Sequence, residues 1–125
     1  MPHIPAGSTP VHDFDGVRFI GIAAPSRGAV ESGVWRVTIP AGSVSRSTHQ
    51  LSREEVLVAL AGTATARIGG ASHAVASGDA LIVPAFTEFS LDNPSAQPFE
   101  ALVVLPVGGR ALMADRPPFV PPWAR

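Results

Sequence analysis

The 125-residue sequence contains no cysteine and no lysine. The absence of cysteine excludes disulfides, thiolate metal sites and cysteine nucleophiles. The absence of lysine excludes lysine Schiff bases and the lysine of a phosphate-binding loop. The nine basic residues, all arginine, and ten acidic residues leave a net charge of −1. This balance gives no electrostatic basis for binding nucleic acid or an anionic membrane.

Long apolar runs are also missing from the sequence. No stretch approaches the ~20 apolar residues that a membrane span requires. The first residues, MPHIPAGSTPVHDFDG, lack the basic head and apolar run of a signal peptide. We therefore expect a cytoplasmic protein without a membrane partner. Thirteen prolines and twelve glycines divide the chain into short pieces and leave little room for a long helix.

Short apolar segments between these prolines and glycines predict β-strands. They are rich in Val, Ile, Leu and Phe, and turn-forming residues bound most of them. The predicted strands cover residues 17–24, 33–40, 55–62, 63–70, 80–84, 87–91 and 99–106. Gly69-Gly70 predicts a two-residue hairpin, because glycine tolerates the positive φ that such turns need. This pattern indicates an all-β sandwich or barrel with very little helix.

The chain length suits one domain spanning residues 1–125. We expect a barrel core over about residues 17–107, an N-terminal arm at 1–16 and a proline-rich tail at 108–125. The tail carries Phe119 and Trp123 among four prolines. Polyproline stiffness lowers the entropy cost of docking these aromatic side chains. We therefore expect the tail to pack on the barrel, the alternative being a disordered tail.

Two segments carry a recognisable order of residues. In the first, a PAG sequence at 40–42 is followed by Glu55, six residues and Gly62. In the second, Gly78 is followed by DALIV, Pro84, Phe89 and Asn93. Together they resemble the two motifs of the cupin superfamily, and the resemblance covers roughly residues 17–107. It implies a small antiparallel β-barrel of the double-stranded β-helix or jelly-roll type, and a homodimer.

The resemblance also implies where a metal would bind. In metal-binding cupins, two histidines and a glutamate of the first motif and a histidine of the second hold one divalent ion such as Fe, Mn, Ni or Zn. Here the second-motif position is Phe89, which cannot ligate. The first-motif pair aligns either with His49 and Leu51 or with Thr48 and Gln50. Strand alternation makes these alternatives exclusive.

We favour the first alignment, because it keeps His49 and needs only one inserted residue. In either alignment at least two of the four ligands are missing, so we expect no metal cofactor. The alternative is a residual divalent ion such as Fe, Mn, Ni or Zn, held by His49, Glu55 and water.

Without the ion, His49 and Glu55 are predicted to form a hydrogen-bonded pair in a pocket walled by Leu51 and Phe89. The glutamate would favour the charged imidazolium and apolar burial would oppose it. Either outcome leaves a group able to move a proton near neutral pH. We assign proton transfer to His49, with Glu55 orienting it.

Leu51, Leu57, Phe89 and Arg36 are assigned to ligand binding. The Arg36 guanidinium could hold a carboxylate or an enolate, the alternative being an arginine on a solvated outer face. Arg46 could gate the barrel mouth, or simply lie on the surface. Trp35 and Val37 are expected in the core or at a dimer contact.

The leading interpretation is a metal-independent cupin that binds a small, largely apolar molecule, aromatic or polyketide-like, in its barrel. If it is an enzyme, it is expected to be a cofactor-independent isomerase, cyclase or dehydratase working by proton transfer. One alternative is a ligand-binding or sensory module without catalysis. The other is a residual metal-dependent enzyme such as a dioxygenase.

Overall fold

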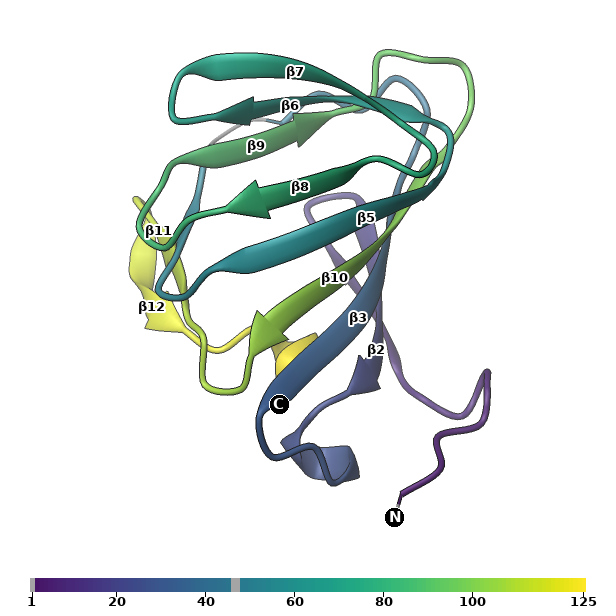
Figure 1. Ribbon diagram of the computed structural model, residues 1–125, viewed down its shortest axis with the longest axis vertical. Coiled ribbons are helices and arrows are strands. Elements are labelled where there is room, and N and C mark those ends of the chain that lie inside the picture. The colour runs from purple at the N-terminus through teal and green to yellow at the C-terminus, as the bar shows by residue number, and fades with distance from the viewer. Residues whose placement is uncertain (1, 46–47) are drawn as a thin grey trace.

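The computed structural model describes residues 2–45 and 48–125, so Arg46 lies outside the described residues. Strands make up 54% of the structure and helices 5% (Figure 1). The expected all-β, antiparallel fold with little helix is therefore confirmed. Within the two described ranges, no helix is long and apolar enough to cross a membrane.

The described residues form twelve strands and two short 3-10 helices. The strands are β1 (Val11–Phe14), β2 (Val17–Ala23), β3 (Ser32–Ile39), β4 (Gln50–Leu51), β5 (Glu55–Ala61), β6 (Thr63–Ile68), β7 (Ala71–Ala76), β8 (Ala80–Val83), β9 (Phe89–Asp92), β10 (Phe99–Pro106), β11 (Ala111–Met113) and β12 (Arg116–Phe119). The helices are η1 (Pro25–Arg27) and η2 (Pro122–Ala124).

The strands form three antiparallel sheets around one core. The largest has the order β1-β2-β3-β10-β5-β8, and the two three-stranded sheets have the orders β12-β11-β4 and β7-β6-β9. Figure 1 shows β11 and β12 on the left side of the view. Bridges between Ser43 and Asn93 and between His49 and Phe89 connect the sheets through irregular segments.

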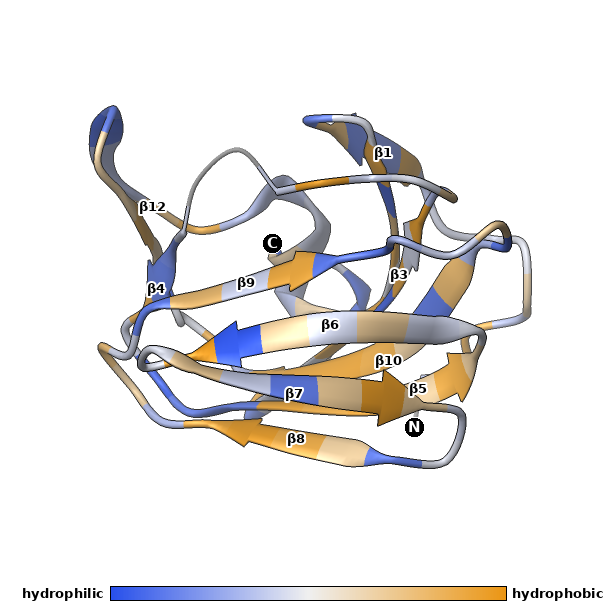
Figure 2. Ribbon diagram, turned by 90° about the horizontal axis from the view of Figure 1, so that it is seen from above, coloured by the Kyte–Doolittle hydropathy of each residue, from blue (hydrophilic) through white to orange (hydrophobic). Residues whose placement is uncertain are grey.

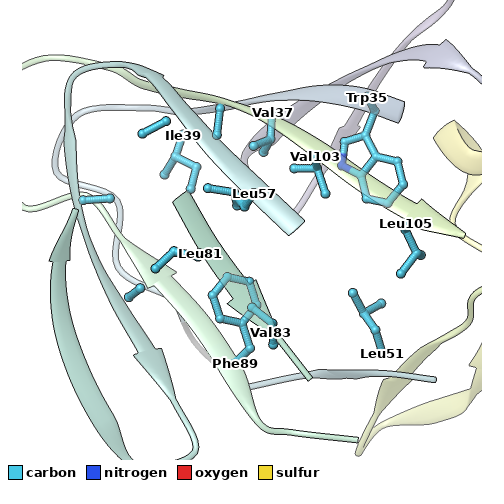
Figure 3. Packing of buried hydrophobic residues seen from close by; sticks show 14 of the residues in the cluster. Trp35, Val37, Ile39, Leu51, Leu57, Leu81, Val83, Phe89, Val103 and Leu105 are labelled. Carbon is cyan, nitrogen blue, oxygen red and sulfur yellow. The ribbon is translucent and has the colours of Figure 1, made fainter. Parts of the chain in front are cut away.

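Alternation of side chains along the strands explains how the core forms. Successive side chains point to opposite faces of a sheet, and buried residues alternate along β3 and β10. Their inward side chains meet those of β5, β8 and β9 in one cluster (Figure 3). Trp35 and Val37 belong to this core, as expected.

Four residues at turns show why the sequence has glycine or asparagine at these positions. Gly69 and Gly70 have φ values of +55° and +86° and join β6 to β7, which confirms the predicted hairpin. A side chain at Gly62 (φ +79°) would collide with the Pro98 carbonyl. The Asn93 amide is fully buried and donates hydrogen bonds to the Ile39 and Gln97 carbonyls at 3.1 and 2.7 Å.

The structure adds strands to both segments that were expected to flank the barrel. Within the arm at 1–16, β1 pairs with β2 at the edge of the large sheet. Within the tail at 108–125, β11 pairs with both β12 and β4. Trp123 then packs flat on the Phe19 ring, with centroids 3.7 Å apart and planes 5° apart. The tail is therefore one wall of the folded domain.

Candidate functional site

A cavity of about 830 Å³ lies inside the barrel. Its inner wall is mainly apolar, with side chains from β3, β5, β9, β10 and β11. Its outer part is framed by the β1–β2 turn, the β11–β12 hairpin and residues 43–45. The lining comprises Phe14, Asp15, Gly16, Val17, Phe19, Trp35, Val37, Ile39, Ser43, Val44, Ser45, His49, Leu51, Glu55, Leu57, Phe89, Leu91, Val103, Ala111, Met113, Asp115, Arg116, Phe119, Pro121 and Trp123.

His49 reaches this cavity through a pair of backbone hydrogen bonds with Phe89. The His49 amide donates to the Phe89 carbonyl at 3.0 Å, and the Phe89 amide donates to the His49 carbonyl at 2.8 Å. The imidazole then lies edge-on to the Phe89 ring, with centroids 5.4 Å apart. Both side chains line the cavity.

Leu51 follows His49 on the same face, as alternation requires. It is buried and lines the cavity, whereas Thr48 and Gln50 line a separate pocket of about 290 Å³. This placement agrees with the alignment that puts His49 and Leu51 inward. His49 also borders the smaller pocket, so its imidazole forms part of the wall between the two spaces.

Glu55 is the first residue of β5 and faces the cavity, followed on the same face by Leu57. The side chains of both residues are buried, with Glu55 5% and Leu57 1% exposed. Glu54, the residue before Glu55, is exposed, because successive residues of an extended chain point to opposite sides. Two adjacent glutamates therefore occupy opposite environments.

Burial shifts the pKa of both polar groups toward their neutral forms. Loss of hydration raises the pKa of Glu55 to about 8 and lowers the pKa of His49 below its ordinary value. An apolar environment disfavours whichever form is charged, which is the anion for glutamate and the cation for histidine. Near neutral pH the cavity thus holds a free imidazole base and a protonated carboxylic acid.

The predicted hydrogen-bonded pair of His49 and Glu55 is not formed. Across the described residues, neither a hydrogen bond nor an ion pair joins them, and burial alone accounts for each pKa shift. His49 is bridged to β9 and Glu55 belongs to the large sheet. Because both groups are neutral, no charge attraction draws them together across the cavity. The two side chains line the same cavity but do not interact directly.

Comparisons with known proteins identify the fold family. A family model described as a cupin domain matches residues 35–105, which is more than half of the chain. The chain belongs to the cupin family. No curated protein matches this cupin at a significant level, and its similarity to solved structures is low enough in sequence to show the fold alone.

Three solved structures illustrate the range of this fold. A sugar phosphate isomerase of the cupin superfamily from Silicibacter pomeroyi is 19% identical, with 92% of this chain and 83% of that chain covered and a TM-score of 0.71. The polyketide cyclase RemF from Streptomyces resistomycificus is 16% identical, with 94% and 87% covered and a TM-score of 0.75. A salicylate 1,2-dioxygenase from Pseudoaminobacter salicylatoxidans is 15% identical, with 86% and 31% covered and a TM-score of 0.70.

The residues of this cupin do not fit the set of four metal ligands that the family resemblance implies. Of the positions that would hold the ion, His49 and Glu55 offer donor atoms, whereas Phe89 and Leu51 offer none. In the described part of the chain, no three or more His, Cys, Asp or Glu side chains are grouped so that they could hold a metal ion.

Arg36 does not reach the cavity of this cupin. It is exposed, and its neighbours Trp35 and Val37 point into the core. Strand alternation therefore directs the guanidinium outward, which corrects its assignment to ligand binding in favour of the outer-face alternative. Leu51, Leu57 and Phe89, which were also assigned to ligand binding, line the cavity.

Arg116 lines the cavity of this cupin and was missed by sequence analysis. Its guanidinium lies 5.0 Å from the Phe14 ring centroid and 5.7 Å from that of Phe119. It also forms an exposed ion pair with Asp115 at 3.3 Å, and its hydrogen bond and positive charge lower the pKa of Asp115. No local signal marks Arg116, because its place depends on how the tail folds back against β1.

One part of the cavity lining in this cupin is aromatic. Trp123 stacks on Phe19, and its centroid lies 6.0 Å from that of Phe14 and 6.5 Å from that of Trp35. These side chains come from β1, β2, β3 and η2. A ligand in the cavity would therefore meet this aromatic surface as well as the His49 and Glu55 groups.

Proposed function

We propose that this cupin binds a small, largely apolar organic molecule in the barrel and moves a proton on it without a metal. The placement of His49 and Glu55 in one apolar cavity carries the proposal. Both groups line the same space, and burial favours the neutral form of each. A neutral imidazole and a neutral carboxylic acid are the complementary groups that general acid–base catalysis needs near neutral pH.

The size and lining of the cavity support a flat, multi-ring ligand. A cavity of about 830 Å³ is within the usual range for a drug-sized ligand. Leu51, Leu57 and Phe89 form an apolar wall around the reactive groups. The other polar side chains of the lining, such as Ser43 and Arg116, belong to segments outside this wall, so a sugar phosphate would lack partners for the hydroxyl groups that lie against it. An aromatic or polyketide-like substrate fits this surface better.

The proposed chemistry is proton transfer next to a carbonyl group. The His49 imidazole takes a proton from the carbon beside the carbonyl, while the Glu55 carboxylic acid donates a hydrogen bond to the carbonyl oxygen. The enolate that results can take the proton back from His49 at another carbon, which is an isomerisation. It can also attack a second carbonyl of the same molecule and then lose water, which is a cyclisation with dehydration. Each outcome needs only an acid and a base.

The main alternative is a binding module without catalysis, which would use the same cavity. Direct binding and proton transfer can be separated experimentally. Both tryptophans of the chain, Trp35 and Trp123, line the cavity, so intrinsic fluorescence should report ligand entry. Binding of a naphthol or anthrone probe without any proton exchange would favour the binding module.

We predict solvent proton exchange into aromatic ketone probes, catalysed by His49 and Glu55. In D₂O, wild-type protein should speed deuterium entry at the carbon beside the carbonyl, measured by mass spectrometry. His49→Ala and Glu55→Gln should each slow the catalysed exchange by roughly 100-fold, because each removes one partner in the transfer. Probe binding should persist, because an acid or base acts mainly in the transition state.

Two exposed residues supply matched controls for this experiment. Glu54→Gln alters the neighbouring glutamate that points outward, and His73→Ala alters an exposed histidine on β7. Both should exchange at the wild-type rate. Equal loss in Glu54→Gln and Glu55→Gln would contradict a role for the cavity carboxyl group.

We also predict less than one equivalent of divalent metal per chain. Phe89 and Leu51 leave an ion with two protein ligands, whereas a stable site of this kind usually has at least three. Elemental analysis should be done after growth in medium supplemented with Fe, Mn, Ni and Zn. One tightly bound ion per chain, lost in His49→Ala, would instead support the metal-dependent alternative.

A further inference from the structure

Arg116 lines the cavity with its guanidinium over two aromatic rings. The guanidinium lies 5.0 Å from the Phe14 ring centroid and 5.7 Å from that of Phe119, and the Arg116 side chain is 37% exposed. Phe14 belongs to β1 and Phe119 to β12. Figure 2 shows both strands at the top of the view, with the hydrophilic colour at the turn before β12. The fold therefore holds a permanent positive charge on the cavity lining.

The guanidinium of Arg116 has hydrogen-bond donors to spare. Its Nε and Nη2 groups donate to the Asp115 carboxylate at 3.3 and 3.4 Å, which is long for a charge-assisted hydrogen bond. A guanidinium has about five N–H donors in one plane, so most of them have no acceptor among the residues that the structure describes. Attraction to the Phe14 and Phe119 rings is electrostatic and needs none of these donors. Arg116 can therefore accept a further partner.

Two aspartates also line the cavity, but turn geometry accounts for both of them. Asp15 has a φ of +50° and joins β1 to β2 together with Gly16, and Asp115 lies in the turn that joins β11 to β12. Aspartate is common in such turns, because its side chain bonds to nearby backbone and because it tolerates positive φ. Arg116 begins a strand, where no turn geometry selects arginine, so its charge on the lining needs a different explanation.

We propose that the substrate of this cupin is an aromatic or polyketide-like carboxylic acid, whose carboxylate pairs with Arg116 while its rings enter the cavity. This substrate class rests on the proposed function, because the rings of the acid occupy the same cavity. A planar guanidinium matches the two oxygens of a carboxylate. Arg116 and His49 both line the cavity and both border the smaller pocket, so one molecule can reach the two groups together.

A ligand with a positive charge fits this part of the lining less well. The rings of Phe14 and Phe119, on which a ligand cation would lie, already hold the guanidinium. Asp15 and Asp115 are both exposed, so water screens their charges and weakens the ion pair of Asp115 with Arg116. A ligand carboxylate that excludes water from Arg116 forms the stronger pair, because opposite charges attract more strongly away from water.

Two probes of the same shape test the charge of the ligand. At pH 7 naphthoate is an anion and naphthamide is neutral, so isothermal titration calorimetry on the full chain measures the effect of the carboxylate alone. Wild-type protein should bind naphthoate roughly 3- to 10-fold more tightly, and this preference should shrink as salt rises from about 0.01 M to about 1 M. Arg116→Gln should abolish the preference and leave naphthamide binding unchanged. Asp115→Asn should increase the preference, because it removes the competing carboxylate.

Arg110→Gln is the matched control, because Arg110 is exposed and lines neither the cavity nor the smaller pocket. It should keep the wild-type preference for naphthoate. If Arg116 only joins the tail to β1, Arg116→Gln should weaken both probes alike, and that result would overturn the proposal. Equal wild-type affinities for the two probes would also overturn it, as would tighter binding of naphthylmethylammonium than of naphthamide. Binding of neither probe would instead contradict the proposed function itself, and the substrate class with it.

Discussion

Replacement of Glu55 by glutamine is expected to stabilise the protein at pH 7 by about 3 kcal/mol. The folded-state pKa of Glu55 is about 8, against 4.5 for an exposed glutamate. At pH 7 the unfolded chain therefore releases a proton that the folded chain retains. This difference favours unfolding, and an amide of the same shape removes it.

The pH dependence of the free energy of unfolding shows in which direction the Glu55 carboxyl group acts. A carboxyl group whose pKa is raised on folding contributes its full stability below about pH 4.5, and loses it as pH rises toward 8. The His49 pKa is shifted in the opposite direction, so His49 costs stability only as pH falls below about 6.5. Measurements between pH 6.5 and 8 thus isolate Glu55.

Urea unfolding across this interval is the measurement. Wild-type stability should fall by about 1 kcal/mol per pH unit between pH 6.5 and 8, whereas Glu55→Gln should show little change. Glu54→Gln is the control and should follow the wild type, because Glu54 is exposed. A wild-type slope in Glu55→Gln would mean that the carboxyl group is hydrated and ionised in the folded protein.

A destabilising carboxyl group in a cavity is itself informative. Leucine or methionine at position 55 would fill apolar space without the cost of a buried acid. Proteins retain such groups where function requires them, and backbone strain or unfavourable burial is concentrated at functional sites. The expected gain in Glu55→Gln and its expected loss of proton exchange are therefore two results of one cause.

The strands of the core could be predicted because local sequence determines them. Alternation in β3, the Gly69-Gly70 turn and the spacing from Glu55 to Gly62 are each contained within a few residues. Strands β1, β4, β11 and β12 were not predicted. Strand β4 has only two residues and β12 contains prolines, so neither has much strand propensity. Both form strands because they pair with segments that are distant in the sequence.

The site could be predicted only in part, because local sequence determines some of its features and not others. The inward direction of His49 and Leu51 follows from alternation once the motif is aligned. The separation of His49 from Glu55 depends on how two sheets face each other across the cavity, which no short stretch of sequence encodes. The aromatic part of the lining likewise combines Phe14, Phe19 and Trp123 from opposite ends of the chain.

Trp123→Ala is expected to destabilise the protein by about 3 to 5 kcal/mol, which is the usual cost of truncating a buried tryptophan. The Trp123 side chain is 7% exposed and stacks at 3.7 Å on Phe19. The loss should lower the melting temperature by roughly 10 °C or more. Deleting residues 117–125 should cost at least as much, because it also removes most of β12.

Two further variants show which property of Trp123 matters. Among the described residues, its indole Nε1 is buried without a hydrogen-bond acceptor, so Trp123→Phe keeps a stacking ring and removes an unsatisfied donor. It should cost clearly less than Trp123→Ala. Phe86→Ala is the control, since Phe86 is 64% exposed and its loss should leave the melting temperature within a few degrees. A melting temperature unchanged by Trp123→Ala and by the deletion would show that the tail does not pack on the barrel in solution.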